Sequence, residues 1–195
     1  MRKNREMTYK RWKENLGNIL TWLHHQPWVN KNKIGCFAIS SGTTAALRLA
    51  QEDQRLSFII SVATCISTNI GMGDGGPCKQ LVDHLESLCN WKAVQLFGIE
   101  FGIDFYLDTI GNAPIYKMQD IKCPVYFLQG GLHNLYRRSD ARLGYELMRM
   151  HNLPSYYNEI STGDHCFDLE PEECAKKSMG WLYKIGIVQD GEWRY

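Results

Sequence analysis

Short apolar runs alternate with amphipathic segments along most of this sequence. The apolar runs lie at 34–39, 58–64, 123–131 and 155–160 and have the length of strands, and the first three are apolar enough to be buried on both faces. Segments with helical spacing lie at 8–25, 43–51, 77–90, 140–150 and 171–185. Strands that alternate with helices predict an α/β fold, with a mainly parallel sheet flanked by helices and right-handed crossovers.

Two segments do not fit this alternation. The aromatic segment 91–118 is expected to be helical and irregular and to form a small cap. The loop GMGDGG at 71–76 lacks the G-x-G-x-x-G spacing and the lysine of a phosphate-binding loop, which argues against a nucleotide-binding domain. Because no repeat or low-complexity linker interrupts the chain, we expect residues 1–195 to form a single domain.

Composition argues against several classes of protein. The net charge of +1 gives no reason to expect nucleic acid or an anionic membrane as a partner. No apolar run approaches the roughly 18 residues needed to span a bilayer. The seven cysteines include no CxxC pair, and the basic N-terminus lacks the apolar core of a signal peptide. We therefore expect reduced thiols in a cytoplasmic protein, with no metal and no cofactor.

The first predicted strand ends in two serines and a glycine, and a helical segment follows directly. A nucleophile on a sharp turn between strand and helix needs small residues two positions before and after it. Ala38 and Gly42 meet this need around Ser40, whereas the positions around Ser41 are bulky and β-branched. Ser40 is therefore the candidate nucleophile, and Ser41 would supply a backbone N–H. The competing interpretation is that Ser40 only caps the following helix.

A histidine follows the last predicted strand. His165 lies in the loop STGDHCFD, before the closing helix. A serine nucleophile needs a general base from another part of the chain. The carboxyl ends of parallel strands meet at one edge of the sheet, so His165 is expected beside Ser40. Four other histidines lie within or at the ends of predicted helices and are interpreted as structural: His24, His25, His84 and His151.

Three stretches that contain these residues resemble a known family. WLHHQPWVNKNKIGCFAISSGTTAALRLAQEDQRLSFIISVA, IKCPVYFLQGGLHNL and GDHCFD are similar to the C-terminal part of α/β-hydrolases, and most of all to the dienelactone-hydrolase-like and prolyl-oligopeptidase-like serine hydrolases. The resemblance implies that Ser40 is the nucleophile, His165 the base and the Ser41 N–H part of an oxyanion hole. It also implies cleavage of an ester, thioester or amide, with a small-molecule or peptide-like acyl group, through an acyl-enzyme.

The resemblance breaks at the acid that would orient the histidine. The family's acid position falls on His133, and Asn134 follows it. Asn134 is the candidate to orient the imidazole, although an amide does not offset the charge of the imidazolium. Asp140 would serve only if its loop folds back, and Asp74 follows another strand from which such folds draw an acid.

The resemblance also breaks at the N-terminus. Met1 is followed almost directly by the helix before the nucleophile strand, so the resemblance implies a truncated α/β-hydrolase fold that lacks its N-terminal strands. The loop that gives the second oxyanion N–H then has no counterpart. One sheet edge would be uncovered, to be covered by a second copy of the chain or by another partner. The alternative function is therefore a non-catalytic remnant that serves as a binding or dimerisation module.

Overall fold

The computed structural model describes residues 8–67, 94–96, 99–101, 103–132 and 139–189. Its main sheet contains four parallel strands, in the order β1-β2-β5-β6. The bounds of these strands are Gly35–Ile39 for β1, Phe58–Val62 for β2, Val125–Gly130 for β5 and Ser155–Ile160 for β6. The expected mainly parallel sheet is confirmed.

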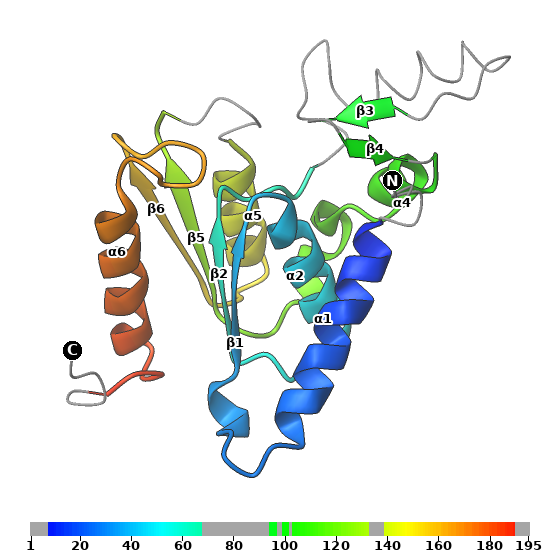
Figure 1. Ribbon diagram of the computed structural model, residues 1–195. Coiled ribbons are helices and arrows are strands. Elements are labelled where there is room, and N and C mark those ends of the chain that lie inside the picture. Colours follow the sequence, from blue (N-terminus) through cyan, green and yellow to red (C-terminus); the bar gives the residue numbers. More distant parts are fainter. Residues whose placement is uncertain (1–7, 68–93, 97–98, 102, 133–138, 190–195) are drawn as a thin grey trace, which may run out of the picture.

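Helices cover both faces of this sheet, as Figure 1 shows. Helix α6 lies on one face, whereas α2 and α5 lie on the other, and α1 packs against the outer side of α2. The bounds of these helices are Tyr9–His24 for α1, Ser41–Glu52 for α2, Ser139–Met150 for α5 and Pro171–Lys184 for α6. A short 3-10 helix, η1, spans Lys31–Lys33 between α1 and β1.

The alternation of side chains along β2 separates two hydrophobic cores. Ile59 belongs to the core beneath α2 and α5, together with Phe127 of β5. Ile60 and Val62 point to the opposite face, where they pack in the core that contains Trp181 of α6. Successive side chains of a strand point to opposite faces, so an apolar run such as FIISV can fill both cores.

The prediction for the segment 91–118 was only partly correct. The segment contains two short antiparallel strands, β3 (Val94–Leu96) and β4 (Ile99–Phe101), which we had not expected. They are followed by α4 (Ile103–Gly111) and by the 3-10 helix η2 (Pro114–Asp120). Strands of three residues are too short to show an alternating pattern, which explains the omission. The expected helix over 77–90 lies outside the described residues.

Polar contacts of Asp108 attach α4 to the rest of the fold. Asp108 of α4 accepts two hydrogen bonds from the Arg48 guanidinium of α2, at 2.9 and 3.0 Å. The same carboxylate accepts a bond of 2.7 Å from the backbone N–H of Lys10, in the first turn of α1. A single carboxylate thus joins three helices.

No helix in the described ranges has the length and apolar character required to cross a membrane.

Candidate active site

Ser40 occupies a strained turn at the carboxyl end of β1. Its backbone has φ 54° and ψ −128°, in the region that non-glycine residues rarely adopt. The turn is held by a hydrogen bond of 2.9 Å from the Ser40 N–H to the carbonyl oxygen of Val62 in β2. The Ser40 side chain makes no capping bond to α2, so the competing interpretation of this residue as a helix cap is wrong.

The small residues on either side of Ser40 have different structural roles. Ala38 is buried with 6% of its surface exposed, as the turn was expected to require. A Cβ added at Gly42, in contrast, would meet no heavy atom within 4 Å. The described part of the chain therefore does not crowd position 42, which contradicts our expectation that this position must be small.

His165 lies beside Ser40, as its place in the sequence predicts. The Nε2 atom of its ring lies 2.8 Å from Ser40 Oγ, although the two residues are 125 positions apart. The loop that carries His165 is fixed to the end of β5, because the Leu132 N–H donates to the Gly163 carbonyl oxygen at 2.9 Å. The loop is also strained: Phe167 has φ 62° and a fully buried side chain.

The surroundings of His165 favour its neutral form. Burial lowers the pKa of the imidazole below its ordinary value of 6.5, and the nearby carboxylates of Asp164 and Asp168 oppose this effect. At neutral pH the ring is therefore uncharged. With the proton on Nδ1, Nε2 can accept the hydrogen bond and then the proton of Ser40, as a general base does.

Side-chain hydrogen bonds fix the segment that follows β2, next to the Ser40 turn. Thr43 Oγ1 accepts from the Cys65 N–H at 3.0 Å, and Thr44 Oγ1 donates to the Cys65 carbonyl oxygen at 2.8 Å. Ala63, at the start of this segment, has φ 49°. Ser40 and Ala63, both non-glycine residues with positive φ, thus directly follow β1 and β2 at the same edge of the sheet. Such backbone strain is concentrated at functional sites.

Asp140 belongs to this network and not to a catalytic triad. Its carboxylate accepts from the N–H groups of Ile66 and Ser67 at 3.1 and 2.9 Å, and from Ser67 Oγ at 2.6 Å. Three other candidates for the acid position lie outside the described residues: Asp74, His133 and Asn134.

A carboxylate of the described residues lies directly before His165 in the sequence. The Oδ1 atom of Asp164 is buried and has no hydrogen-bond partner. An unpaired buried carboxylate oxygen is unfavourable unless a positive charge lies nearby. The imidazolium that forms on His165 during proton transfer would be such a charge. Sequence reasoning did not identify Asp164, because nothing in the loop GDHCFD distinguishes its two aspartates from surface residues.

Ser41 is the first residue of α2 and lies beside the Ser40 turn. The positive end of a helix dipole favours negative charge at this point, as an oxyanion on the attacked carbonyl would require.

No cluster of histidine, cysteine or carboxylate side chains within the described ranges has the arrangement of a metal site. The five cysteines of these ranges are free thiols.

Comparison with solved structures identifies the architecture. Est1E from Butyrivibrio proteoclasticus, solved with ferulic acid bound, matches with a TM-score of 0.75 over 92% of this chain and 70% of its own, at 12% identity. The acylaminoacyl peptidase of Pyrococcus horikoshii matches with a TM-score of 0.63 over 92% of this chain, at 14% identity. The chain has the α/β-hydrolase fold.

Two of the similar structures are much longer than this chain. This chain spans 28% of the Pyrococcus horikoshii peptidase. The dipeptidyl peptidase 4 of Porphyromonas gingivalis matches with a TM-score of 0.65 over 89% of this chain, at 11% identity, and this chain spans 22% of its length. No family model and no curated protein matches the sequence. The comparisons therefore establish the fold, and in this α/β-hydrolase fold Ser40 and His165 lie at the carboxyl edge of the parallel sheet.

Proposed function

We propose that this chain is a serine hydrolase module that cleaves an ester, a thioester or an amide through an acyl-enzyme on Ser40. The observation that carries the proposal is the distance of 2.8 Å between Ser40 Oγ and His165 Nε2, with Ser40 held at a positive φ. A nucleophile and a base in hydrogen-bond contact are the minimum that acyl transfer by serine requires. The names of the similar structures, which include peptidases, are consistent with an acyl substrate.

The reaction uses the neutral form of His165. Ser40 Oγ attacks the carbonyl carbon of the substrate, and its proton moves to Nε2 of His165. The carbonyl oxygen becomes an oxyanion beside the Ser41 N–H at the start of α2. When the intermediate collapses, the bond to the leaving group breaks and His165 returns the proton to that group. Water then attacks the acyl-enzyme with His165 again as the base, and the acid is released.

The test is labelling of the folded chain with a fluorophosphonate, followed by intact-mass spectrometry. In this reaction Ser40 Oγ displaces fluoride from phosphorus, and no acyl substrate has to be known. We expect a single adduct on the wild type and on Ser41→Ala, which keeps its backbone N–H. The Ser40→Ala variant should give none. A folded wild-type chain that gives no adduct would contradict the proposal.

A second candidate function follows from β1, which within the described residues pairs with another strand on one side only. In that case the chain is a non-catalytic α/β-hydrolase remnant, and the sheet edge serves to bind another polypeptide. Turnover of a fluorogenic ester that depends on Ser40 would rule out this candidate as the whole function. Absence of both adduct and turnover in a folded chain would favour it.

A further inference from the structure

The hydroxyl of Thr43, in the first turn of α2, joins the Ser40 turn to the segment that follows β2. Thr43 Oγ1 donates to the Ser40 carbonyl oxygen at 2.6 Å and accepts from the Cys65 N–H at 3.0 Å. Both directions are fixed, because a carbonyl oxygen can only accept and a backbone N–H can only donate. The single hydroxyl proton of Thr43 is therefore committed to Ser40.

Both backbone polar groups of Ser40 are thereby attached to the chain of β2. Its N–H donates directly to the Val62 carbonyl oxygen at 2.9 Å, and its carbonyl oxygen is linked through Thr43 to Cys65. Ser40 has φ 54°, and a non-glycine residue keeps such a strained conformation only where its surroundings hold it. The two attachments supply this support for the residue that carries the candidate nucleophile.

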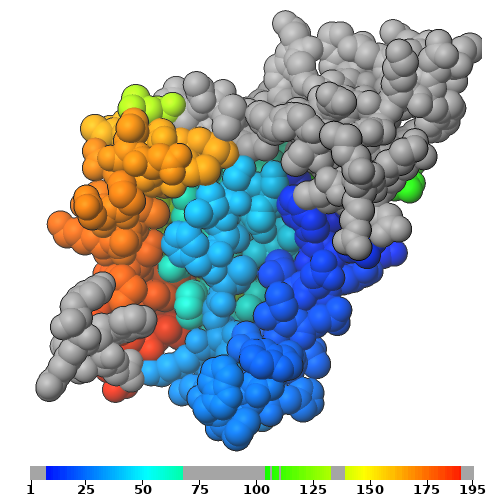
Figure 2. Space-filling view, viewed as in Figure 1, coloured from blue at the N-terminus to red at the C-terminus, as the bar shows by residue number. Residues whose placement is uncertain are grey.

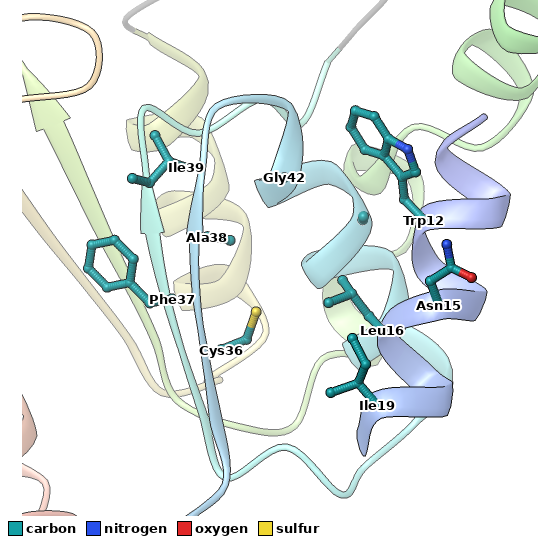
Figure 3. Close-up of a pocket in the computed structure, with 10 residues that line it drawn as sticks. Trp12, Asn15, Leu16, Ile19, Cys36, Phe37, Ala38, Ile39 and Gly42 are labelled. Carbon is teal, nitrogen blue, oxygen red and sulfur yellow. The ribbon is translucent and has the colours of Figure 1, made fainter. Parts of the chain in front are cut away.

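The opposite side of the turn supplies no comparable support. Figure 3 shows the turn between Ile39 and Gly42, beside a groove of about 340 Å³ that runs between β1 and α1. A Cβ added at Gly42 would meet no heavy atom of another part of the described chain within 4 Å. Within the described residues, α2 therefore leaves the groove side of the turn open and secures its β2 side through Thr43.

The link through Thr43 is buried and ends at a fixed point. Thr43 is completely buried and Cys65 exposes only 3% of its surface, so water cannot take over their bonds. Without the hydroxyl, the Cys65 N–H would be a buried donor with no partner, which is unfavourable. The Cys65 carbonyl oxygen accepts from Thr44 Oγ1 at 2.8 Å, and the Asp140 carboxylate accepts from the N–H groups of the next two residues.

We propose that Thr43 is a positioning residue for Ser40, whose hydroxyl holds the turn so that Ser40 Oγ stays within reach of His165. Figure 2 shows the two segments that must meet: the orange segment with the His165 loop lies against the light-blue segment with the Ser40 turn. Thr43 acts through the backbone of Ser40. The inference rests on the proposed function, because it concerns the reaction of Ser40 with an acyl group.

The test measures the kinetics of fluorophosphonate labelling in variants of the full 195-residue chain. In this reaction Ser40 Oγ forms a bond to phosphorus, fluoride leaves, and the serine proton passes to His165. Thr43→Val keeps the shape of the side chain and removes the hydroxyl. Thr43→Ala and Thr43→Ser both lack the methyl group and differ in the hydroxyl alone, so this pair gives the same comparison if valine prevents folding. The control is Thr109→Val in α4, which removes a buried hydroxyl whose bond to the Phe105 carbonyl oxygen is also 2.6 Å long.

We expect Thr43→Val and Thr43→Ala to lower the maximal rate constant of labelling by about tenfold or more, because a displaced nucleophile loses its alignment with the base. Thr43→Ser should restore most of this rate, and Thr109→Val should keep the wild-type value. The pH of half-maximal rate should not change, because the hydroxyl bonds to the Ser40 backbone and not to the His165 ring. A purely structural role would make Thr43→Val less resistant to urea and leave the maximal rate of the folded protein unchanged, and that result would overturn the inference.

Amide exchange measured by NMR gives a second readout, which needs no reaction. In Thr43→Val or Thr43→Ala, exchange of the Ser40 N–H should accelerate by about tenfold more than that of the Ile59 N–H, which donates to the Pro124 carbonyl oxygen and reports on unfolding of the whole sheet. Equal acceleration at both amides, or no recovery of labelling in Thr43→Ser, would overturn the inference and leave Ser40 as the nucleophile. A folded wild-type chain without an adduct would instead contradict the proposed function, and the exchange at Ser40 would then decide whether Thr43 holds the turn.

Discussion

Gly130 lies against the backbone of Asp164, so closely that a Cβ at position 130 would clash with the Asp164 carbonyl oxygen. This contact joins the end of β5 to the loop that carries His165. The obstacle is backbone and not a flexible side chain, so the loop would have to move to accept a larger residue. The position of His165, the candidate base, therefore depends on a glycine at the end of β5.

Gly130→Ala should displace the His165 loop and slow fluorophosphonate labelling of Ser40 by about tenfold or more, because a base moved by about 1 Å loses its alignment. The matched control is Gly180→Ala in α6, where a Cβ meets nothing within 4 Å. This control should keep the labelling rate and raise the free energy of unfolding by up to about 1 kcal/mol through helix propensity. Equal labelling rates in the two variants would show that the loop does not depend on the contact.

The rate of labelling should depend on pH through His165. Only the neutral ring can accept the proton of Ser40, and burial lowers the pKa of this ring below 6.5. The rate should therefore rise with pH, reach half its maximum below pH 6.5, and be constant through neutral pH. A half-maximum clearly above pH 6.5 would mean that another group controls the reaction.

Asp164→Asn should shift this profile further toward acid. The carboxylates of Asp164 and Asp168 both raise the pKa of His165 against the effect of burial, and the effect of Asp164 is the larger. Removal of the Asp164 charge therefore lowers that pKa. Asp168→Asn is the matched variant and should give a smaller shift in the same direction. The pH dependence of labelling in both variants measures these shifts. A loss of rate at every pH, without a shift, would indicate a structural role for Asp164.

Arg48→Met should lower the free energy of unfolding by about 3–5 kcal/mol, because it leaves the Asp108 carboxylate without its buried partner. The two side chains expose only 7% and 9% of their surfaces, so solvent does not replace the lost bonds. Urea denaturation measures the change. The double variant Arg48→Met with Asp108→Leu should recover much of the loss, because no unpaired charge is then buried. A single variant as stable as wild type would show that the pair does not anchor α4.

The sequence predicted the four strands of the main sheet, the helices α1, α2, α5 and α6, and the meeting of Ser40 with His165, because each depends on a regular pattern. Hydrophobic periodicity identifies strands and helices, and a parallel sheet brings the ends of its strands to one edge. The hydrogen bonds of Asp140 to Ser67 follow no such pattern, because they join residues 73 positions apart through loop geometry. The strands β3 and β4 are too short for a pattern to appear.

The proposed crowding at Gly42 shows a different limit. A motif indicates which residues a turn tolerates, but only the surrounding chain decides whether a position is crowded. In the described residues the space beside Gly42 is open, and this glycine lines the groove along β1. The buried Oδ1 atom of Asp164, which has no hydrogen-bond partner, could not be predicted either, because the burial of a single atom depends on the final packing of the loop.

The distance along the chain between Ser40 and His165 has a consequence for folding. The two residues are 125 positions apart, and the chain between them includes β2, β5 and β6, which must be in register before the two side chains meet. Contacts of such sequence separation form late, because a large loop has to close first. Reactivity of Ser40 toward a fluorophosphonate would therefore appear only when the whole sheet has assembled. In a refolding experiment, the labelled fraction would count the molecules that have completed the final step.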